Sequence, residues 1–140
     1  MALKGSGSDV TSSFITAAAA DPNGISTVAT ISGAANLTIN GALADGGSVT
    51  MDCPRNVTIL SAADDSGITF TVTGTDESGT AITEVITGAD STTATGSSFF
   101  QTVTQIATSG SSTGNVSAGS GTSCSGVISA ARCRLRGIYV

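Results

Sequence analysis

The chain contains no histidine and no tryptophan, and only five of its 140 residues are lysine or arginine. Without histidine, imidazole metal sites and the Ser-His-Asp and Cys-His catalytic arrangements are excluded within one chain. The formal net charge of −5 also argues against a nucleic-acid partner, because proteins that bind nucleic acid usually carry a basic patch. We therefore expect neither an enzyme nor a nucleic-acid binder, and we expect no cofactor.

Long apolar runs are missing as well. No stretch of about 18 apolar residues is present, so the sequence predicts no membrane-spanning helix. The opening residues, MALKGSGSD, lack the apolar core of about 7–15 residues that a secretory signal contains. We expect synthesis in a cytoplasm and no membrane partner.

Cysteine is scarce, with Cys53, Cys124 and Cys133 as the three examples. An odd number without a secretory signal does not indicate a disulfide framework, and the absence of a C-x-x-C pair argues against zinc. We expect small buried thiols, with a Cys124–Cys133 bridge formed after cell lysis as the alternative.

Threonine, serine, alanine and glycine are abundant and together fill 80 of the 140 positions. Valine and isoleucine number 21 against five leucines, a balance that favours half-buried strands over helices. From Gly24 onward, short apolar alternations are separated by Gly, Asn, Asp and Ser at intervals of about 8–12 residues. The sequence therefore predicts one all-β domain over residues 24–140, a sandwich with Ig-like or jelly-roll-like topology.

The alternations locate the expected strands and core. The strands are predicted at residues 25–32, 36–40, 47–52, 56–62, 67–74, 80–88, 99–107, 114–119, 126–130 and 132–140. The remainder of 109–125 reads as a long loop. In the segment GITFTVTG the apolar residues share one face, and Gly79 closes a turn to the next strand in the left-handed region. The predicted core comprises Ile68, Phe70, Val72, Ile82, Ile86, Val103 and Ile106.

Residues 1–23 differ from the rest and predict an extended N-terminal arm. They are rich in Gly, Ser and Ala, and Asp-Pro-Asn-Gly at 21–24 is a strong turn signal. Phe14 and Ile15 are the arm's candidate anchors, because ordering such a segment requires apolar surface to bury.

Two pairs of adjacent acidic residues fall in predicted turns. Asp64/Asp65 and Asp76/Glu77 could supply oxygen ligands to calcium, but neither matches the spaced D-x-[DN]-x-[DN]-G pattern. Asp65-Ser66-Gly67 resembles the loop of aspartic proteases, whose chemistry needs two such carboxylates and hence a dimer. We interpret all four residues as solvated turn acids and expect no metal.

The basic residues are unevenly placed. Arg132, Arg134 and Arg136 recur at period two, so in a strand their guanidinium groups project from one face; we call them the arginine stripe. One interpretation is a solvated edge that carries protective charges. The other is an ion-pairing surface that grips carboxylates of a neighbour, because arginine binds carboxylate with two parallel hydrogen bonds.

Several segments taken together resemble a known family. PRNVTI, ITFTVTGTDESGTAITEVITG, FFQTVTQI and RLRGIYV are similar to segments of small virion proteins of tailed bacteriophages, the capsid decoration, cement or head-fibre proteins. The resemblance covers over half of the chain. It implies a non-enzymatic protein, made in the host cytoplasm, that sits on the outside of the capsid lattice and bridges capsid subunits.

The resemblance implies two partners, the major capsid protein and the protein itself. A homotrimer is preferred and a dimer is the alternative. We expect Phe14, Ile15 and the arginine stripe to make these contacts, and otherwise the loops around residues 45–47 and 109–125. The rival function is an Ig-like adhesin module that recognises a host glycan or protein.

Overall fold

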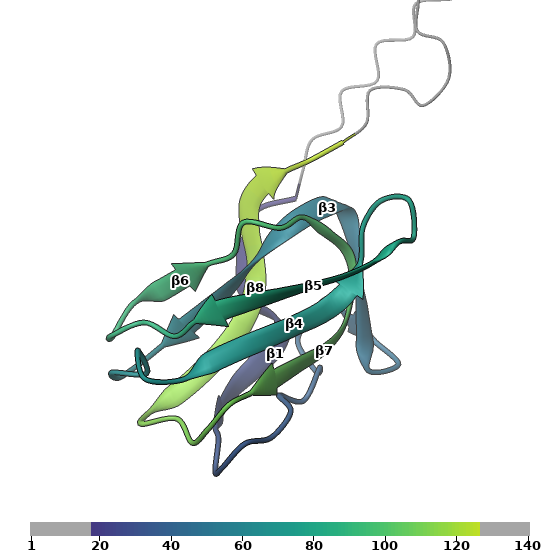
Figure 1. Ribbon diagram of the computed structural model, residues 1–140. Coiled ribbons are helices and arrows are strands. Elements are labelled where there is room, and N and C mark those ends of the chain that lie inside the picture. Colours follow the sequence, from purple (N-terminus) through teal and green to yellow (C-terminus); the bar gives the residue numbers. More distant parts are fainter. Residues whose placement is uncertain (1–17, 127–140) are drawn as a thin grey trace, which may run out of the picture.

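The computed structural model describes residues 18–126 (Figure 1). This range forms eight β-strands and no helix, which confirms the all-β prediction. No helix long and apolar enough to span a membrane occurs among these residues. The strands are β1 (Asp21–Thr30), β2 (Ala44–Asp45), β3 (Ser48–Ser61), β4 (Thr69–Thr75), β5 (Ala81–Thr87), β6 (Thr93–Thr95), β7 (Phe100–Thr108) and β8 (Asn115–Cys124). The strand predicted at 132–140, and all but the first residue of that at 126–130, lie outside the described residues.

Hydrogen bonds join the strands into one open antiparallel sheet in the order β1-β8-β3-β7-β4-β5, with β2 and β6 each paired to β3. The predicted Ig-like or jelly-roll-like sandwich is therefore not confirmed. Ile25 on β1 and Ile86 on β5 belong to the same buried cluster, although β1 and β5 lie at opposite ends of the strand order. The sheet must curve around a single core for both residues to reach it.

Strand β3 replaces two predicted strands, those at 47–52 and 56–62. Its first half pairs with β7, with Val49 opposite Val103, and its second half pairs with β8, with Val57 opposite Ser120. The register shifts on either side of Arg55, next to Pro54. Proline has no N–H to donate and interrupts a ladder, so the sequence correctly marks a break. The chain nevertheless continues through it as one strand that serves both halves of the sheet.

The β4–β5 hairpin forms as predicted. Thr71 faces Val85 across the pair, and the Gly79 amide donates to the Asp76 carbonyl at 3.1 Å. Gly79 has φ +80°, the left-handed conformation that glycine adopts without steric cost. The core prediction is also confirmed: five of its seven residues are buried, and Ile68 and Ile82 are half-buried against them.

Two predictions near the N-terminal side are wrong. Residues 21–24 belong to β1, and the turn signal there becomes a register shift between Asp21 and Ser26, with the Asn23 amide donating to Asp21 Oδ1 at 3.2 Å. Residues 36–40 form no strand. They are held to β7 at one point only, by the bridge from Asn36 to Ala107, where the buried Leu37 donates its amide to the Ile106 carbonyl at 2.8 Å.

The strand predicted at 114–119 is confirmed and is longer than expected: β8 extends to Cys124, through residues predicted as a loop, and lies between β1 and β3. Its small residues suit this position because another segment passes close over it. A side chain at Gly119 would collide with the backbone of Asp21 and Pro22. The Gly/Ser-rich sequence thus reflects close packing of backbones, which composition alone cannot distinguish from a loop.

The interpretation of the acidic pairs as solvated is wrong for Asp65. Its side chain is 2% exposed, and Oδ1 accepts a hydrogen bond from the Thr113 amide at 2.7 Å. Asp65 therefore holds the loop before β8. Asp64 is exposed, and hydrogen bonds from the Ser66 hydroxyl and amide lower its pKa. Within residues 18–126, no group of three Cys, Asp or Glu side chains could hold a metal ion.

Candidate functional site

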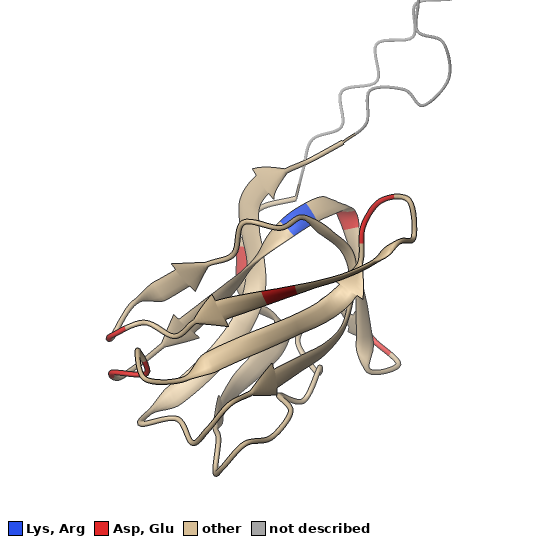
Figure 2. Cartoon of the chain, viewed as in Figure 1, with Lys and Arg blue, Asp and Glu red and all other residues tan. Residues whose placement is uncertain are grey.

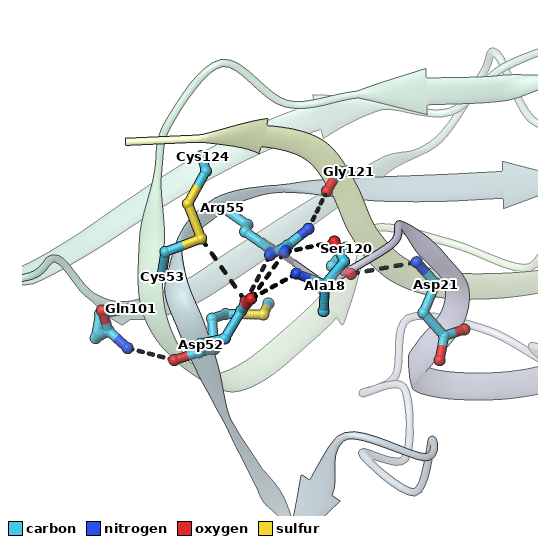
Figure 3. A network of polar contacts seen from close by, with 10 residues as sticks. Ala18, Asp21, Asp52, Cys53, Arg55, Gln101, Ser120, Gly121 and Cys124 are labelled. Atoms are coloured by element: carbon cyan, nitrogen blue, oxygen red, sulfur yellow. Dashed lines mark hydrogen bonds and ion pairs between the residues drawn. A yellow bond between two sulfur atoms is a disulfide. The ribbon is translucent and has the colours of Figure 1, made fainter. Parts of the chain in front are cut away.

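The described chain begins and ends around one buried side chain, that of Arg55 on β3 (Figure 3). Arg55 is 1% exposed. Nε donates to Asp52 Oδ1 at 2.7 Å and Nη2 to Asp52 Oδ2 at 2.9 Å, a two-pronged ion pair. Nη2 also donates to the Ala18 carbonyl at 2.6 Å, and Nη1 donates to the Gly121 carbonyl at 3.0 Å. One guanidinium group therefore ties the start of the described chain to the end of β8.

The electrostatics of the ion pair follow from these contacts. The hydrogen bond from Arg55 holds the pKa of the Asp52 carboxyl well below its usual range, and the Ala18 amide, which donates to Oδ2 at 2.8 Å, adds to this effect. The same ion pair raises the pKa of Arg55. Both groups therefore stay charged, and the Arg55 charge is satisfied inside the protein.

A disulfide lies beside this ion pair and overturns the prediction of free thiols. Cys53 and Cys124 are bonded, with Cα atoms 6.0 Å apart and a separation of 71 positions in sequence. Arg55 and Cys124 face each other across the β3–β8 pair, which brings Cys53 within reach. Only the strand pairing creates this proximity, so sequence spacing could not reveal it. Cys133, the other partner considered for Cys124, lies outside the described residues.

We call the set of Ala18, Asp52, Cys53, Arg55, Gly121 and Cys124 the Arg55 junction. Sequence reasoning missed it, although one signal was present: Arg55 is the only basic residue between Lys4 and Arg132. A lone arginine inside an apolar alternation is expected to find a carboxylate, because an unpaired buried charge is costly.

The five predicted contact residues, Phe14, Ile15, Arg132, Arg134 and Arg136, all lie outside the described residues. The structure does place the residues from which they continue. Ala18 follows Ile15 by three positions, Ser125 precedes Arg132 by seven, and the Ser125 amide donates to the Pro54 carbonyl at 2.9 Å. Both terminal segments therefore start from the same end of the domain (Figure 1).

Charge is divided sharply between the described domain and the terminal segments. Residues 18–126 hold nine of the ten acidic residues and one of the five basic residues, Arg55 (Figure 2). The other four basic residues are Lys4 and the arginine stripe. The surface of the described domain is consequently negative, and the stripe carries the opposite charge.

A pocket of about 300 Å³ lies at the Arg55 junction itself and is lined by Ala18, Ala19, Leu43, Thr50, Met51, Asp52, Arg55 and Ser120. Two other pockets lie nearby. The first, of about 230 Å³, is where the described chain ends, and we call it the exit pocket; it is lined by Pro54, Asp76, Glu77, Ser78, Phe99 and Ser125. The second, of about 310 Å³, lies over β3, β6 and β8 and is lined by uncharged residues, many with hydroxyl groups. Asn56 lies in its lining, and the buried Oδ1 of this side chain has no hydrogen-bond partner among the described residues.

Comparisons of the chain with protein-family models, with curated proteins and with solved structures find no match.

Proposed function

We propose that the protein is a non-enzymatic decoration, or cement, protein of a tailed bacteriophage, which binds the outside of the capsid lattice. The observation that supports this proposal best is the shared origin of the two terminal segments at the Arg55 junction. A domain attached to a surface by two segments from one end leaves its other faces exposed, as decoration of a shell requires. The similarity of PRNVTI, FFQTVTQI and RLRGIYV to virion proteins supports the same function.

The proposed contacts combine burial and charge. Phe14 and Ile15 bury apolar surface against the capsid, and the arginine stripe pairs with carboxylates of the major capsid protein. An exposed ion pair contributes only about 0–1 kcal/mol. A homotrimer that engages several capsid sites at once multiplies these small terms through effective concentration. This is why we propose self-association, with a trimer preferred over a dimer, together with capsid binding.

Co-sedimentation with capsids that lack the protein tests the proposal. A deletion of residues 1–17 should sharply weaken binding while leaving the β domain folded; it stops before Ala18, since that residue contacts Arg55. Replacing all three stripe arginines by glutamine should weaken binding and flatten its salt dependence. Replacing them by lysine is the control, because the charge remains. Absence of wild-type binding would contradict the decoration function. Binding that neither change affects would place the interface elsewhere, on the turn at 45–47 or on the segment 109–125.

The adhesin alternative has one feature in its favour, the uncharged pocket over β3, β6 and β8. Its hydroxyl groups and the Asn56 amide offer hydrogen bonds to a neutral polar ligand such as a glycan. A gene beside the major capsid gene favours decoration. A gene within a tail-fibre or surface-protein operon favours the adhesin.

A further inference from the structure

We propose that the open edge of β5 pairs with the same edge of a second copy of this chain, antiparallel and about a two-fold axis at Val85. This inference rests on the proposed self-association and deepens it, because it names a surface for the dimer, the alternative to the trimer. The pairing needs no capsid, so the two proposals can fail separately.

The first argument is the direction of the backbone groups of β5. Hydrogen-bonded and non-hydrogen-bonded residue pairs alternate along an antiparallel ladder. At one end of the β4–β5 ladder the Gly88 amide donates to the Ile68 carbonyl at 2.9 Å. At the other end the Asp76 amide donates to the Thr80 carbonyl at 2.9 Å. Steps of two residues from either bond give the same result: alternate residues of β5 turn their N–H and C=O groups away from β4, namely Thr83, Val85 and Thr87.

These outward groups lie along an open edge of the sheet. β5 is the last strand in the sheet order, and within residues 18–126 it pairs with β4 alone (Figure 1). The three outward residues are exposed, and Val85, at 61%, is the most exposed large apolar residue of the described range. A row of unpaired N–H and C=O groups is a template for another strand.

β5 lacks the features that usually protect an edge, such as proline, outward charge and bulges. Its seven residues include no proline, lysine or arginine, and its ladder with β4 has no register shift. Its one charged residue is Glu84, whose carboxylate accepts hydrogen bonds from the Ser97 amide at 2.6 Å and the Ser98 amide at 3.1 Å. This charge is therefore satisfied within one copy. The opposite edge strand, β1, contains Pro22 and two register shifts, so we expect pairing at β5 only.

A single open edge favours a second copy as the partner. Head-to-tail contacts between two different surfaces build filaments, whereas an edge that pairs with itself closes a two-fold dimer. Centred on Val85, the pairing sets like residues opposite each other: Val85 faces Val85 of the second copy, and Thr83 faces Thr87. Each facing pair exchanges two backbone hydrogen bonds, and β-branched pairs are favourable across strands. Centring on Glu84 instead would set two carboxylates opposite each other.

The distribution of charge favours the same edge. Residues 18–126 hold nine acidic residues and one basic residue, so two copies repel each other over most of their surface. The outward side chains of β5 are uncharged, which allows two copies to approach there. One pair of strands buries a small area, and we therefore expect a weak dimer, of the class with interfaces below about 1,200 Å².

Sedimentation equilibrium of the full chain over a concentration series tests the pairing. We expect a reversible monomer–dimer equilibrium that persists at about 1 M NaCl, where a Debye length of about 3 Å screens exposed ion pairs. Val85→Lys should weaken dimerisation by roughly tenfold or more, because it sets two like charges opposite each other at the axis. Val28→Lys is the matched control, since Val28 is 57% exposed on the other edge strand, β1, and it should leave the equilibrium unchanged.

Cross-linking tests the register. Paired residues at a hydrogen-bonded site have Cα atoms about 5.5 Å apart, within the range of about 4.4–6.8 Å that a disulfide spans. Oxidised glutathione should therefore link two copies of a Val85→Cys variant in a Cys133→Ser background. Thr83→Cys in the same background should not form this link, because the two copies of residue 83 are four positions apart along the paired strands, or about 13 Å.

The outcomes either support the pairing or overturn it. A monomer at every concentration, a trimer, or a dimer that Val85→Lys leaves intact overturns it. So does association that disappears at high salt, which would assign the contact to ion pairs. Equal cross-linking of the Val85→Cys and Thr83→Cys variants contradicts the two-fold axis at Val85. None of these measurements contains capsid, so a negative result leaves capsid binding by the chain standing.

Discussion

Asp52 and Arg55 are three residues apart on β3 and form a two-pronged ion pair that ties both ends of the described chain to the sheet. Asp52 is 38% exposed, whereas Arg55 is buried. The pair is therefore reached by water on the carboxylate side only. The guanidinium group contributes most to the junction, because it donates hydrogen bonds to the Ala18 and Gly121 carbonyls as well as to Asp52.

Replacing Arg55 by methionine should destabilise the fold by about 2–3 kcal/mol, below the 3–5 kcal/mol of a fully buried broken pair because Asp52 is partly solvated. The loss arises from the carboxylate and the two carbonyls left without a donor. Urea unfolding measures it. A change within about 0.5 kcal/mol, as for ordinary surface substitutions, would show that the junction contributes little.

Acid should remove part of this stability. The folded-state pKa of Asp52 lies below its unfolded value of about 3.9, so the contribution is complete at neutral pH and is lost as pH falls below about 5. The difference in unfolding free energy between the wild type and Asp52→Asn should therefore narrow from pH 7 toward pH 2. Asp64, whose pKa is also lowered, is present in both proteins and cancels. A difference that is constant with pH would contradict the assignment.

Breaking the Cys53–Cys124 bond should cost about 2–4 kcal/mol, because the bond closes a long loop in the unfolded chain. Cys53→Ser and Cys124→Ser should each show this loss, and Cys133→Ser should not. Peptide mapping under non-reducing conditions provides the direct check. A dominant peptide linking Cys124 to Cys133 would refute the pairing.

Gly119→Ala should destabilise the protein by about 1–3 kcal/mol, because the added methyl group meets the backbone of Asp21 and Pro22. Gly67→Ala is the matched control, since nothing lies within 4 Å of its added atom and its φ is not positive. Thermal unfolding of both variants compares them. Equal stability would mean that β1 does not pass over β8 as described.

The sequence predicts those parts of the fold that depend on local pattern. The β4–β5 hairpin follows from strict alternation and Gly79, and the core around Phe70 and Val72 follows from the same period. It predicts only the first half of β8, at 114–119, and assigns the second half to a loop, because the small residues near Gly119 are selected by a segment that packs over them from about 100 residues earlier in the chain.

The candidate site could be predicted only in part. The charge of the arginine stripe is visible in the sequence, whereas the Arg55 junction depends on the pairing of β3 with β8. The burial of Asp65 has the same origin, since its partner Thr113 lies 48 residues away. Local rules assign a turn acid to solvent, and only the tertiary fold reverses that assignment.

The most direct test of the decoration function is the copy number of this chain in purified particles of the phage whose genome encodes it, measured by quantitative mass spectrometry against the major capsid protein. A lattice component is present in a fixed ratio to the capsid protein, and thus in hundreds of copies in a particle. We predict that result. A few copies, or none, would contradict the account.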